Sequence, residues 1–374
     1  MPKRSRKSTP SRKSKKARIE MAAHEQPTHV VTAEGEEVNV PEVVEDVKLE
    51  EVFEEPHLTF RPKRVLKGKY KEVPREQDIR AMFPVFDNKM MHLSTQKGDI
   101  ANRVIVCSDE KSAWRLARFF DNPAEVIKVL STRHFLTYTG LFQGVPISVI
   151  ASGMGGPMVD FTMREAKFCI SGPMAVVRFG KCCSISNLSE GDVVVCTKGC
   201  FNVQSDFNAL KGSDSTQKAY KISEIAMPDE NLSSLLKSKI STTLPKSETC
   251  KDGILGTSDS FYASQARFDR KFGDENENLM NEILMKYPRC RTMDMESYNV
   301  IATALMAKKK DIYASAVSLI VTNRMHSDKK MSKAQEIEAE DLSGYGIFKA
   351  LASFDFPEGE PLATLDMIKK VKFT

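Results

Sequence analysis

The chain has few aromatic residues and no long apolar run. Of its 374 residues 8% are aromatic, and Trp114 is the single tryptophan. No segment approaches the roughly 20 consecutive apolar residues that a membrane-spanning helix needs. The basic N-terminal run also lacks the apolar core of a secretory signal and the apolar face of a mitochondrial presequence. We therefore expect no membrane partner and a cytoplasmic or nuclear location.

Cysteine is sparse, and its spacing suits neither disulfides nor zinc. The eight cysteines are scattered, and the adjacent pair Cys182–Cys183 is poorly placed to form a bridge. Cys196 and Cys200 have no histidine or second cysteine pair nearby, as a zinc site would require. We expect buried, reduced thiols and no metal site.

The net charge of +5 conceals two opposed blocks near the N-terminus. Residues 3–18 are almost all basic, serine or proline, whereas residues 34–55 are strongly acidic. Neither block can bury a core, so residues 1–60 are predicted to form a disordered tail, basic then acidic. The basic run is typical of a nuclear-localisation or nucleic-acid-contacting segment, and equally of a solvated tail without a partner. Apart from this run, we expect no nucleic-acid partner.

Strands and helices alternate from about residue 83, which predicts one α/β domain over residues 83–356. Some expected strands are continuous apolar runs, typical of strands covered on both faces. The polar segment 201–248 is expected to pass over a sheet edge. Strands are predicted at 103–107, 145–151, 174–179, 192–196, 253–257, 291–295 and 315–322, and helices at 112–120, 157–170, 231–239, 277–286, 298–308 and 341–354.

The segment Phe261–Asp269 carries the most specific chemical pattern. Gln265 offers an amide donor and acceptor side by side, and Arg267 offers a planar fork of donors. Together they could read the imide edge of uracil, which presents an acceptor, a donor and an acceptor. The alternative is a polar surface loop.

Three further positions could bind a nucleoside or an anion. Arg178 follows apolar residues in a strand, so its charge must be paired in a salt bridge or used for an oxyanion or phosphate. A carboxylate within Asp294–Ser297 could accept both hydroxyls of a ribose, or merely favour a helix N-terminus. The glycine turn Ser152–Pro157 would let a ligand approach the backbone, or is simply a tight corner.

In order and spacing, these segments resemble those of the nucleoside phosphorylase family, and most closely the uridine phosphorylases. The resemblance implies a single-domain αβα sandwich with a central mixed, partly barrel-like sheet. It also implies a homodimer or higher homo-oligomer. The matching segments lie at residues 91–93, 131–137, 152–157, 177–180, 258–262, 265–267, 293–297 and 321–324.

The activity implied by the resemblance is phosphorolysis of uridine to uracil and ribose 1-phosphate. Inorganic phosphate is then a co-substrate, and no cofactor is needed. Uracil would leave with anionic character, stabilised by the base-binding side chains, and the catalytic residues would be Arg178, Arg267 and Gln265. The implied ligands are Arg178 and a neighbour's Arg133 for phosphate; Glu296, Met295 and a neighbour's His92 for ribose; and Gln265, Arg267 and Phe261 for the base, with Arg324 supporting Arg267.

Asn323 bears on the choice of base. Purine-specific relatives carry an aspartate at this position, which protonates the leaving purine. This chain has an asparagine, as uridine-cleaving relatives do. The missing acid and the Gln265/Arg267 pair therefore both favour a pyrimidine.

The departures from the family pattern cluster in the phosphate half of the site. Relatives carry a Gly-Asp-Pro-x-Arg turn, but this chain has Ser108–Ser112, so serine replaces the phosphate-binding arginine. Where relatives read Gly-Thr/Ser-x-Gly after Arg178, this chain has Lys181 and Cys183. Lys181 could bind phosphate as a point charge in place of the missing arginine. His134 replaces a carboxylate that helps to bind a monovalent cation in bacterial relatives, so we expect no such cation.

Three hypotheses follow for the activity. In the first, the chain is an active or slow uridine phosphorylase that relies on Lys181 or Lys111. Alternatively, it is a catalytically inactive binding subunit, which in a hetero-oligomer could complete the site of an active paralogue through Arg133 and His92. A nucleoside hydrolase ranks last, because the sequence offers no evident base for activating water.

Overall fold

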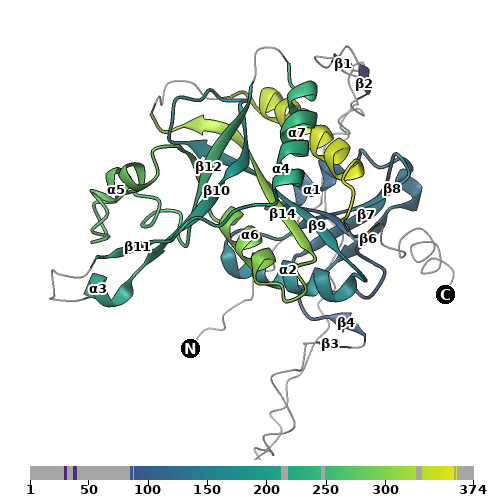
Figure 1. The fold of residues 1–374 in the computed structure, drawn as a ribbon, viewed down its shortest axis with the longest axis horizontal. Coiled ribbons are helices and arrows are strands. Elements are labelled where there is room, and N and C mark those ends of the chain that lie inside the picture. Colours follow the sequence, from purple (N-terminus) through teal and green to yellow (C-terminus); the bar gives the residue numbers. More distant parts are fainter. Residues whose placement is uncertain are drawn as a thin grey trace, which may run out of the picture.

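The structure is a computed structural model that describes residues 29–31, 37–39, 85–86, 88–211, 218–245, 249–325, 331–357 and 359 (Figure 1). Of the predicted tail at residues 1–60, it describes the antiparallel pair β1 (His29–Val31) and β2 (Glu37–Asn39). The rest of that tail, including its basic run, lies outside the described residues. No helix in the described part of the chain is long and apolar enough to cross a membrane.

The domain is built around one ten-stranded mixed sheet, beside which β3 (Val85–Phe86) and β4 (Lys89–Met90) form a small separate pair. The strands of the large sheet are β5 (Arg103–Cys107), β6 (Ile127–Leu130), β7 (Leu136–Phe142), β8 (Val145–Ala151), β9 (Met174–Ser184), β10 (Val193–Ser205), β11 (Tyr220–Ile222), β12 (Cys250–Ser258), β13 (Cys290–Asp294) and β14 (Ile312–Asn323).

Part of this sheet closes on itself. The strand order is β11-β10-β12-β13-β9-β5-β8-β7-β6, and β14 pairs with both β10 and β9. Strands β10, β12, β13, β9 and β14 therefore form a barrel-like ring, from which β5, β8, β7 and β6 continue as an open sheet. Because β9 belongs to both parts, residues on β9 lie where the ring meets the open sheet.

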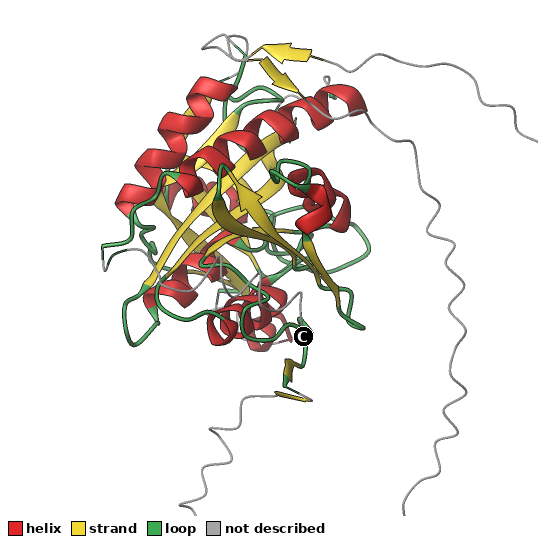
Figure 2. Ribbon diagram, turned by 90° about the vertical axis from the view of Figure 1, so that its right-hand side faces the viewer, coloured by secondary structure: helices red, strands yellow, loops and turns green. Residues whose placement is uncertain are grey.

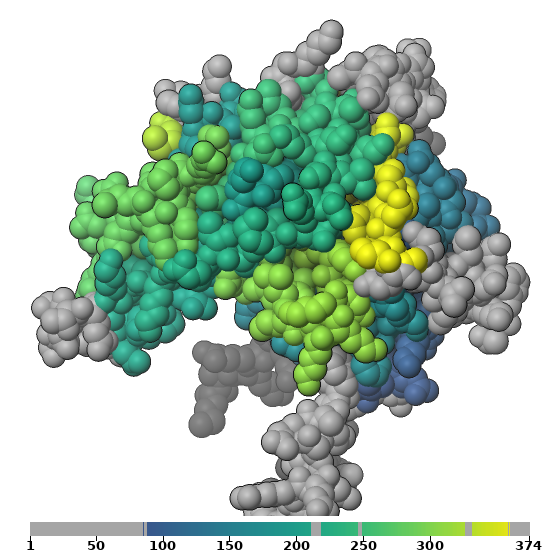
Figure 3. Space-filling view, in the orientation of Figure 1, coloured from purple at the N-terminus to yellow at the C-terminus, as the bar shows by residue number. Residues whose placement is uncertain are grey.

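Helices cover both faces of the sheet (Figure 2). One face is packed by α1, α4 and α7, and the other by α2 and α6. The segments around α5 and β11 lie together at one end of the molecular face shown in Figure 3. The helices are α1 (Glu110–Ala117), α2 (Gly156–Cys169), α3 (Phe207–Lys211), α4 (Glu230–Thr243), α5 (Leu279–Lys286), α6 (Ser297–Leu305) and α7 (Lys333–Ala352).

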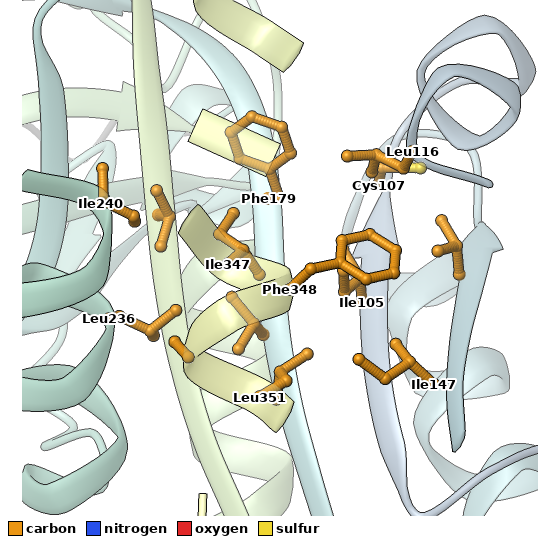
Figure 4. Packing of buried hydrophobic residues seen from close by; sticks show 14 of the residues in the cluster. Ile105, Cys107, Leu116, Ile147, Phe179, Leu236, Ile240, Ile347, Phe348 and Leu351 are labelled. Atoms are coloured by element: carbon orange, nitrogen blue, oxygen red, sulfur yellow. The ribbon is translucent and has the colours of Figure 1, made fainter. Parts of the chain in front are cut away.

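The largest core cluster joins α7 to the open sheet. Phe348 of α7 is fully buried and points toward Ile105 of β5 (Figure 4). Leu236 of α4 packs in the same cluster. Since full burial of one such side chain contributes about 1.5–3 kcal/mol, this cluster holds α4 and α7 firmly against the sheet.

The structure confirms the predicted αβα sandwich with its mixed, partly barrel-like sheet, but several elements differ in extent. Strand β9 was predicted to end at Phe179 and runs to Ser184, because its polar end pairs with β13 and β14. Helix α7 starts well before the predicted residue 341, at Lys333, because Ser332 and Gln335 form a capping box.

The prediction for residues 201–248 was wrong in part. The second half of β10 lies in this segment, where it pairs with β12 and β11 and is fully buried at Phe201 and Val203. Strands β6 and β7 were not predicted, because β7 carries the polar residues Thr137 and Thr139 at buried positions. Thr139 is accommodated there because its hydroxyl donates a hydrogen bond of 2.7 Å to the carbonyl oxygen of Asp99.

Candidate active site

A buried ion pair between Arg178 and Glu296 lies at the centre of the candidate site. Arg178 is on β9, Glu296 directly precedes α6, and their side chains are 3% and 5% exposed. The guanidinium Nη2 donates to Glu296 Oε2 and to Ser108 Oγ, the latter at 3.1 Å. The other oxygen of Glu296, Oε1, accepts a hydrogen bond of 2.8 Å from the backbone N–H of Gly155. One carboxylate thus joins the predicted phosphate ligand to the glycine turn.

Neighbouring carboxylates keep the buried Arg178 charged. Burial alone would lower the pKa of the Arg178 guanidinium, but attraction to Glu296 and Asp294 outweighs it and raises that pKa above its usual value. Phosphate approaching Arg178 must compete with Glu296, the same residue predicted to hold ribose. Ribose hydroxyls donating to Glu296 would therefore help to free the arginine for an anion.

The side chain of Arg178 folds back across Gly180. Residues i and i+2 of a strand share a face, and a Cβ added to Gly180 would lie 1.1 Å from Nη1 of Arg178. Any side chain at position 180 would therefore expel the guanidinium from its place beside Glu296.

The turn Ser108–Ser112 is held by hydrogen bonds between its own residues. Asp109 caps α1, where its carboxylate accepts hydrogen bonds of 2.8 Å from both the backbone N–H and the hydroxyl of Ser112. Burial would raise the pKa of Asp109, but these bonds and nearby Lys181 outweigh it and lower that pKa. The residue that replaces the family's phosphate-binding arginine thus donates its hydroxyl hydrogen to a neighbouring carboxylate.

Lys181, predicted to replace that arginine, lies among three carboxylates. Its Nζ is 3.3 Å from Glu336, 3.6 Å from Glu340 and 3.7 Å from Asp109. Burial would lower the pKa of Lys181, but Glu340, Asp109 and Glu336 outweigh it and raise that pKa. Glu340 is 1% exposed and also pairs with Arg115 at 2.7 Å. Phosphate could bind Lys181 only against the repulsion of these carboxylates.

The predicted base-binding loop brings Gln265 and Arg267 into the same region. Gln265 Nε2 donates to the backbone carbonyl of Asp294 at 3.3 Å, and Arg267 Nη2 lies 3.4 Å from Cys183 Sγ. The Arg267 guanidinium also lies 4.2 Å over the ring centroid of Phe261. Among the described residues, Gln265 Oε1 and Arg267 Nε are buried without a hydrogen-bond partner. Such groups are uncommon in folded proteins, and both of these lie in the loop that is predicted to bind the base.

Arg324 supports this loop through its backbone. Its guanidinium donates to the carbonyl oxygens of Gln265 at 2.7 Å and Ala266 at 2.9 Å. Ala266 has a positive φ of 52°, a conformation that costs energy for an alanine. Burial and the nearby charge of Arg267 lower the pKa of Arg324. The predicted support of Arg267 by Arg324 is therefore indirect, through the loop conformation.

Of the two carboxylates near the predicted ribose site, Asp294 has a structural role. It accepts hydrogen bonds from the Thr257 hydroxyl at 2.7 Å and from the backbone N–H groups of Glu296 and Ser297 at 3.2 Å each. These bonds hold the start of α6. Glu296, with Met295 half-buried beside it, therefore remains the predicted ribose ligand of the two carboxylates.

His92 contacts the loop that carries Arg133. His92 stacks on Phe161 and meets the edge of Phe135, which follows exposed Arg133 by two residues. The described contacts of these residues join neither of them to the Arg178–Glu296 pair. The expectation that both serve a neighbouring subunit stays a prediction.

In comparisons with known proteins, the chain matches nucleoside phosphorylases in both sequence and structure. A family model described as the phosphorylase superfamily matches residues 102–344. Uridine phosphorylase of Thermococcus kodakarensis is 24% identical over 292 residues, covering 75% of this chain and 93% of that protein. A DeoD-type purine nucleoside phosphorylase of Buchnera aphidicola is 25% identical over 229 residues, covering 61% and 85%. A solved structure from work on uridine phosphorylases of Phytophthora capsici matches with TM-score 0.70 and 28% identity, covering 74% and 98%.

Replacing Gly180 by alanine should break the central ion pair. The added methyl group would displace the Arg178 guanidinium and leave two buried charges unpaired, which costs about 3–5 kcal/mol. We expect a large fall in the melting temperature of Gly180→Ala. Gly273→Ala is the control, because its Cβ would meet open space, and it should change stability by less than about 0.5 kcal/mol. Equal stability of both variants would contradict this geometry.

Replacing Lys181 by an uncharged residue should make the free energy of unfolding less sensitive to pH in the acidic range. Lys181 helps to lower the pKa of Asp109 and Glu336 in the folded state, so its contribution is present at neutral pH and is lost as both carboxylates protonate below about pH 4. Lys181→Met should lower stability by at most about 1 kcal/mol at pH 7, because Asp109 is partly exposed and its attraction to Lys181 is screened by solvent, and it should approach the wild type as both carboxylates become protonated. Urea titrations across this range provide the measurement, and a difference that grows toward low pH would contradict the network.

Proposed function

Because the chain belongs to the phosphorylase superfamily, we propose that it cleaves uridine with inorganic phosphate to give uracil and ribose 1-phosphate. The observation that supports uridine as the substrate is that Gln265 Oε1 and Arg267 Nε are buried without a hydrogen-bond partner among the described residues. An amide beside a guanidinium complements the acceptor–donor–acceptor edge of uracil. Arg324 keeps that loop in its strained conformation, so the base ligands are positioned before substrate arrives.

In the proposed reaction, these residues act as follows. A phosphate oxygen forms a bond to the anomeric carbon of the ribose as the bond to the uracil nitrogen breaks, and the electron pair leaves with the base. Arg267 and Gln265 stabilise the negative charge that develops on uracil. Glu296 accepts the ribose hydroxyls, and Arg178 then holds phosphate beneath the sugar, so much of the rate gain comes from positioning.

One observation favours a second candidate, an inactive nucleoside-binding subunit. Lys181 is already engaged by three carboxylates, and the hydroxyl of Ser112 is taken by Asp109. Loss of one charge-assisted contact to phosphate costs roughly 1.5–3 kcal/mol. In this alternative the nucleoside half of the site is retained, and His92 and Arg133 complete the site of an active paralogue in a hetero-oligomer. The first candidate instead assembles as a homo-oligomer.

The first test is the loss of uridine absorbance with and without inorganic phosphate. We expect uracil release only with phosphate, and Arg267→Ala should lower kcat/KM at least about 100-fold, because it removes stabilisation of the leaving base. Arg270→Ala, an exposed arginine in the same loop, is the matched control and should be unaffected. Uridine binding by calorimetry without turnover would favour the inactive subunit, and absence of both would reject both candidates.

Replacing Asn323 by aspartate should not produce a purine-cleaving site. The Asn323 amide donates to the carbonyl oxygens of Ser186 at 2.9 Å and Leu188 at 2.5 Å, while its oxygen accepts from Met325 N–H at 2.8 Å. An ionised carboxylate would face both carbonyls without a hydrogen to donate. We expect Asn323→Asp to lose about 1–3 kcal/mol of stability and to gain no inosine cleavage.

The control for this variant is Asn231→Asp, an exposed position in the first turn of α4. An acidic residue is well tolerated there because of the helix dipole, so the melting temperature should stay near that of the wild type. Inosine phosphorolysis by Asn323→Asp at unchanged stability would show that the asparagine is not structural.

A further inference from the structure

The imidazole of His92 is held in one orientation. Its Nδ1 lies 2.5 Å from Glu165 Oε1, and its ring is stacked on Phe161 with centroids 3.8 Å apart and planes 6° from parallel. Phe135 meets the ring edge-on at 6.4 Å. A side chain fixed by a carboxylate and by two aromatic rings has lost nearly all its rotational freedom.

Glu165 is buried and holds the segment that contains His92 and Leu93. It lies on the inner face of α2, is 2% exposed, and also accepts hydrogen bonds from the backbone N–H of His92, at 3.1 Å, and of Leu93, at 2.8 Å. A carboxylate is rarely buried unless its oxygens are satisfied in this way. By contrast, Asp160 of the same helix is exposed and pairs with Arg164 on the surface.

The arrangement determines which nitrogen of His92 is available. Because Nδ1 faces a carboxylate, it carries a hydrogen, and Nε2 is left for another partner. Nε2 makes no hydrogen bond to any residue that the structure describes, and the side chain is 16% exposed. Nε2 can therefore accept from, or when protonated donate to, a hydroxyl group presented at the surface.

Arg133 lies close in sequence to this aromatic support. The ring of Phe135 contacts both His92 and Phe161, and the exposed Arg133 precedes Phe135 by two residues. His92 suits a ribose hydroxyl and Arg133 suits a phosphate, and these are the two groups that a nucleoside and a phosphate bound by a second copy would present.

We propose that Glu165 is a positioning residue, which orients His92 Nε2 toward the 5′-hydroxyl of a nucleoside bound by a neighbouring subunit. The inference rests on the proposed function, since it assumes a nucleoside ligand. It adds that recognition of the 5′-hydroxyl depends on a buried carboxylate that never touches the substrate.

The test compares uridine with 5′-deoxyuridine, using the full-length protein. In the wild type, kcat/KM should favour uridine, and Glu165→Gln should reduce this preference by about tenfold, the value of one hydrogen bond. His92→Ala should reduce it equally, and adding Glu165→Gln to His92→Ala should have no further effect on the ratio. Asp160→Asn, the same chemical change on the exposed face of α2, should leave the ratio unchanged.

Two results would overturn the role of Glu165. One is an equal loss of activity toward both nucleosides, which indicates a purely structural residue. The other is a further fall in the ratio when Glu165→Gln is added to His92→Ala. If Glu165→Gln is unfolded in a thermal melt, Phe161→Leu replaces it, because it loosens the ring while keeping the carboxylate, and it should lower the ratio in the same direction.

The same comparison separates this role from the proposed function. Without turnover, the ratio is measured as the two dissociation constants by calorimetry. If wild-type protein binds uridine better than 5′-deoxyuridine and Glu165→Gln keeps that preference, the role of Glu165 alone fails. If the wild type binds neither nucleoside, the proposed function fails and this role fails with it.

Discussion

The ion pair between Arg178 and Glu296 is the interaction on which the rest of the site depends. Two charges are removed from water, and such a pair is stabilising only when its geometry is good and its remaining hydrogen-bonding groups are satisfied. The chain meets this requirement with the missing Cβ of Gly180, the N–H of Gly155 and the capping of α6 by Asp294. Three segments distant in sequence therefore meet at one carboxylate.

The two halves of the site differ in electrostatic character. In the nucleoside half, Gln265 and Arg267 keep buried polar atoms without partners, within a loop fixed by Arg324. In the phosphate half, Lys181 and Ser112 are satisfied by the protein's own carboxylates. The predicted base ligands therefore have unpaired polar atoms, whereas the predicted phosphate ligands already contact carboxylates of the chain.

Features that depend on local sequence pattern could be predicted from the sequence, whereas contacts between residues distant in the sequence could not. Apolar runs located strands such as β5 and β8, and the Gln265/Arg267 spacing identified a loop in which Gln265 is buried and two polar atoms lack a hydrogen-bond partner among the described residues. The partners of Lys181 on α7 could not be predicted, because Glu336 and Glu340 reach it only through helix packing. Glu165 was missed for a similar reason, since nothing in its local sequence distinguishes it from the exposed Asp160.

Helix α2 connects the Arg178–Glu296 ion pair to His92. At its N-terminus, the N–H of Gly155 contacts Glu296 in the chain's own pocket, and farther along, Glu165 holds His92. A helix of 14 residues spans about 20 Å. The same helix therefore supports both the chain's own Glu296 and the residue that is predicted to serve a neighbour, so a substitution that shifts α2 would disturb both at once.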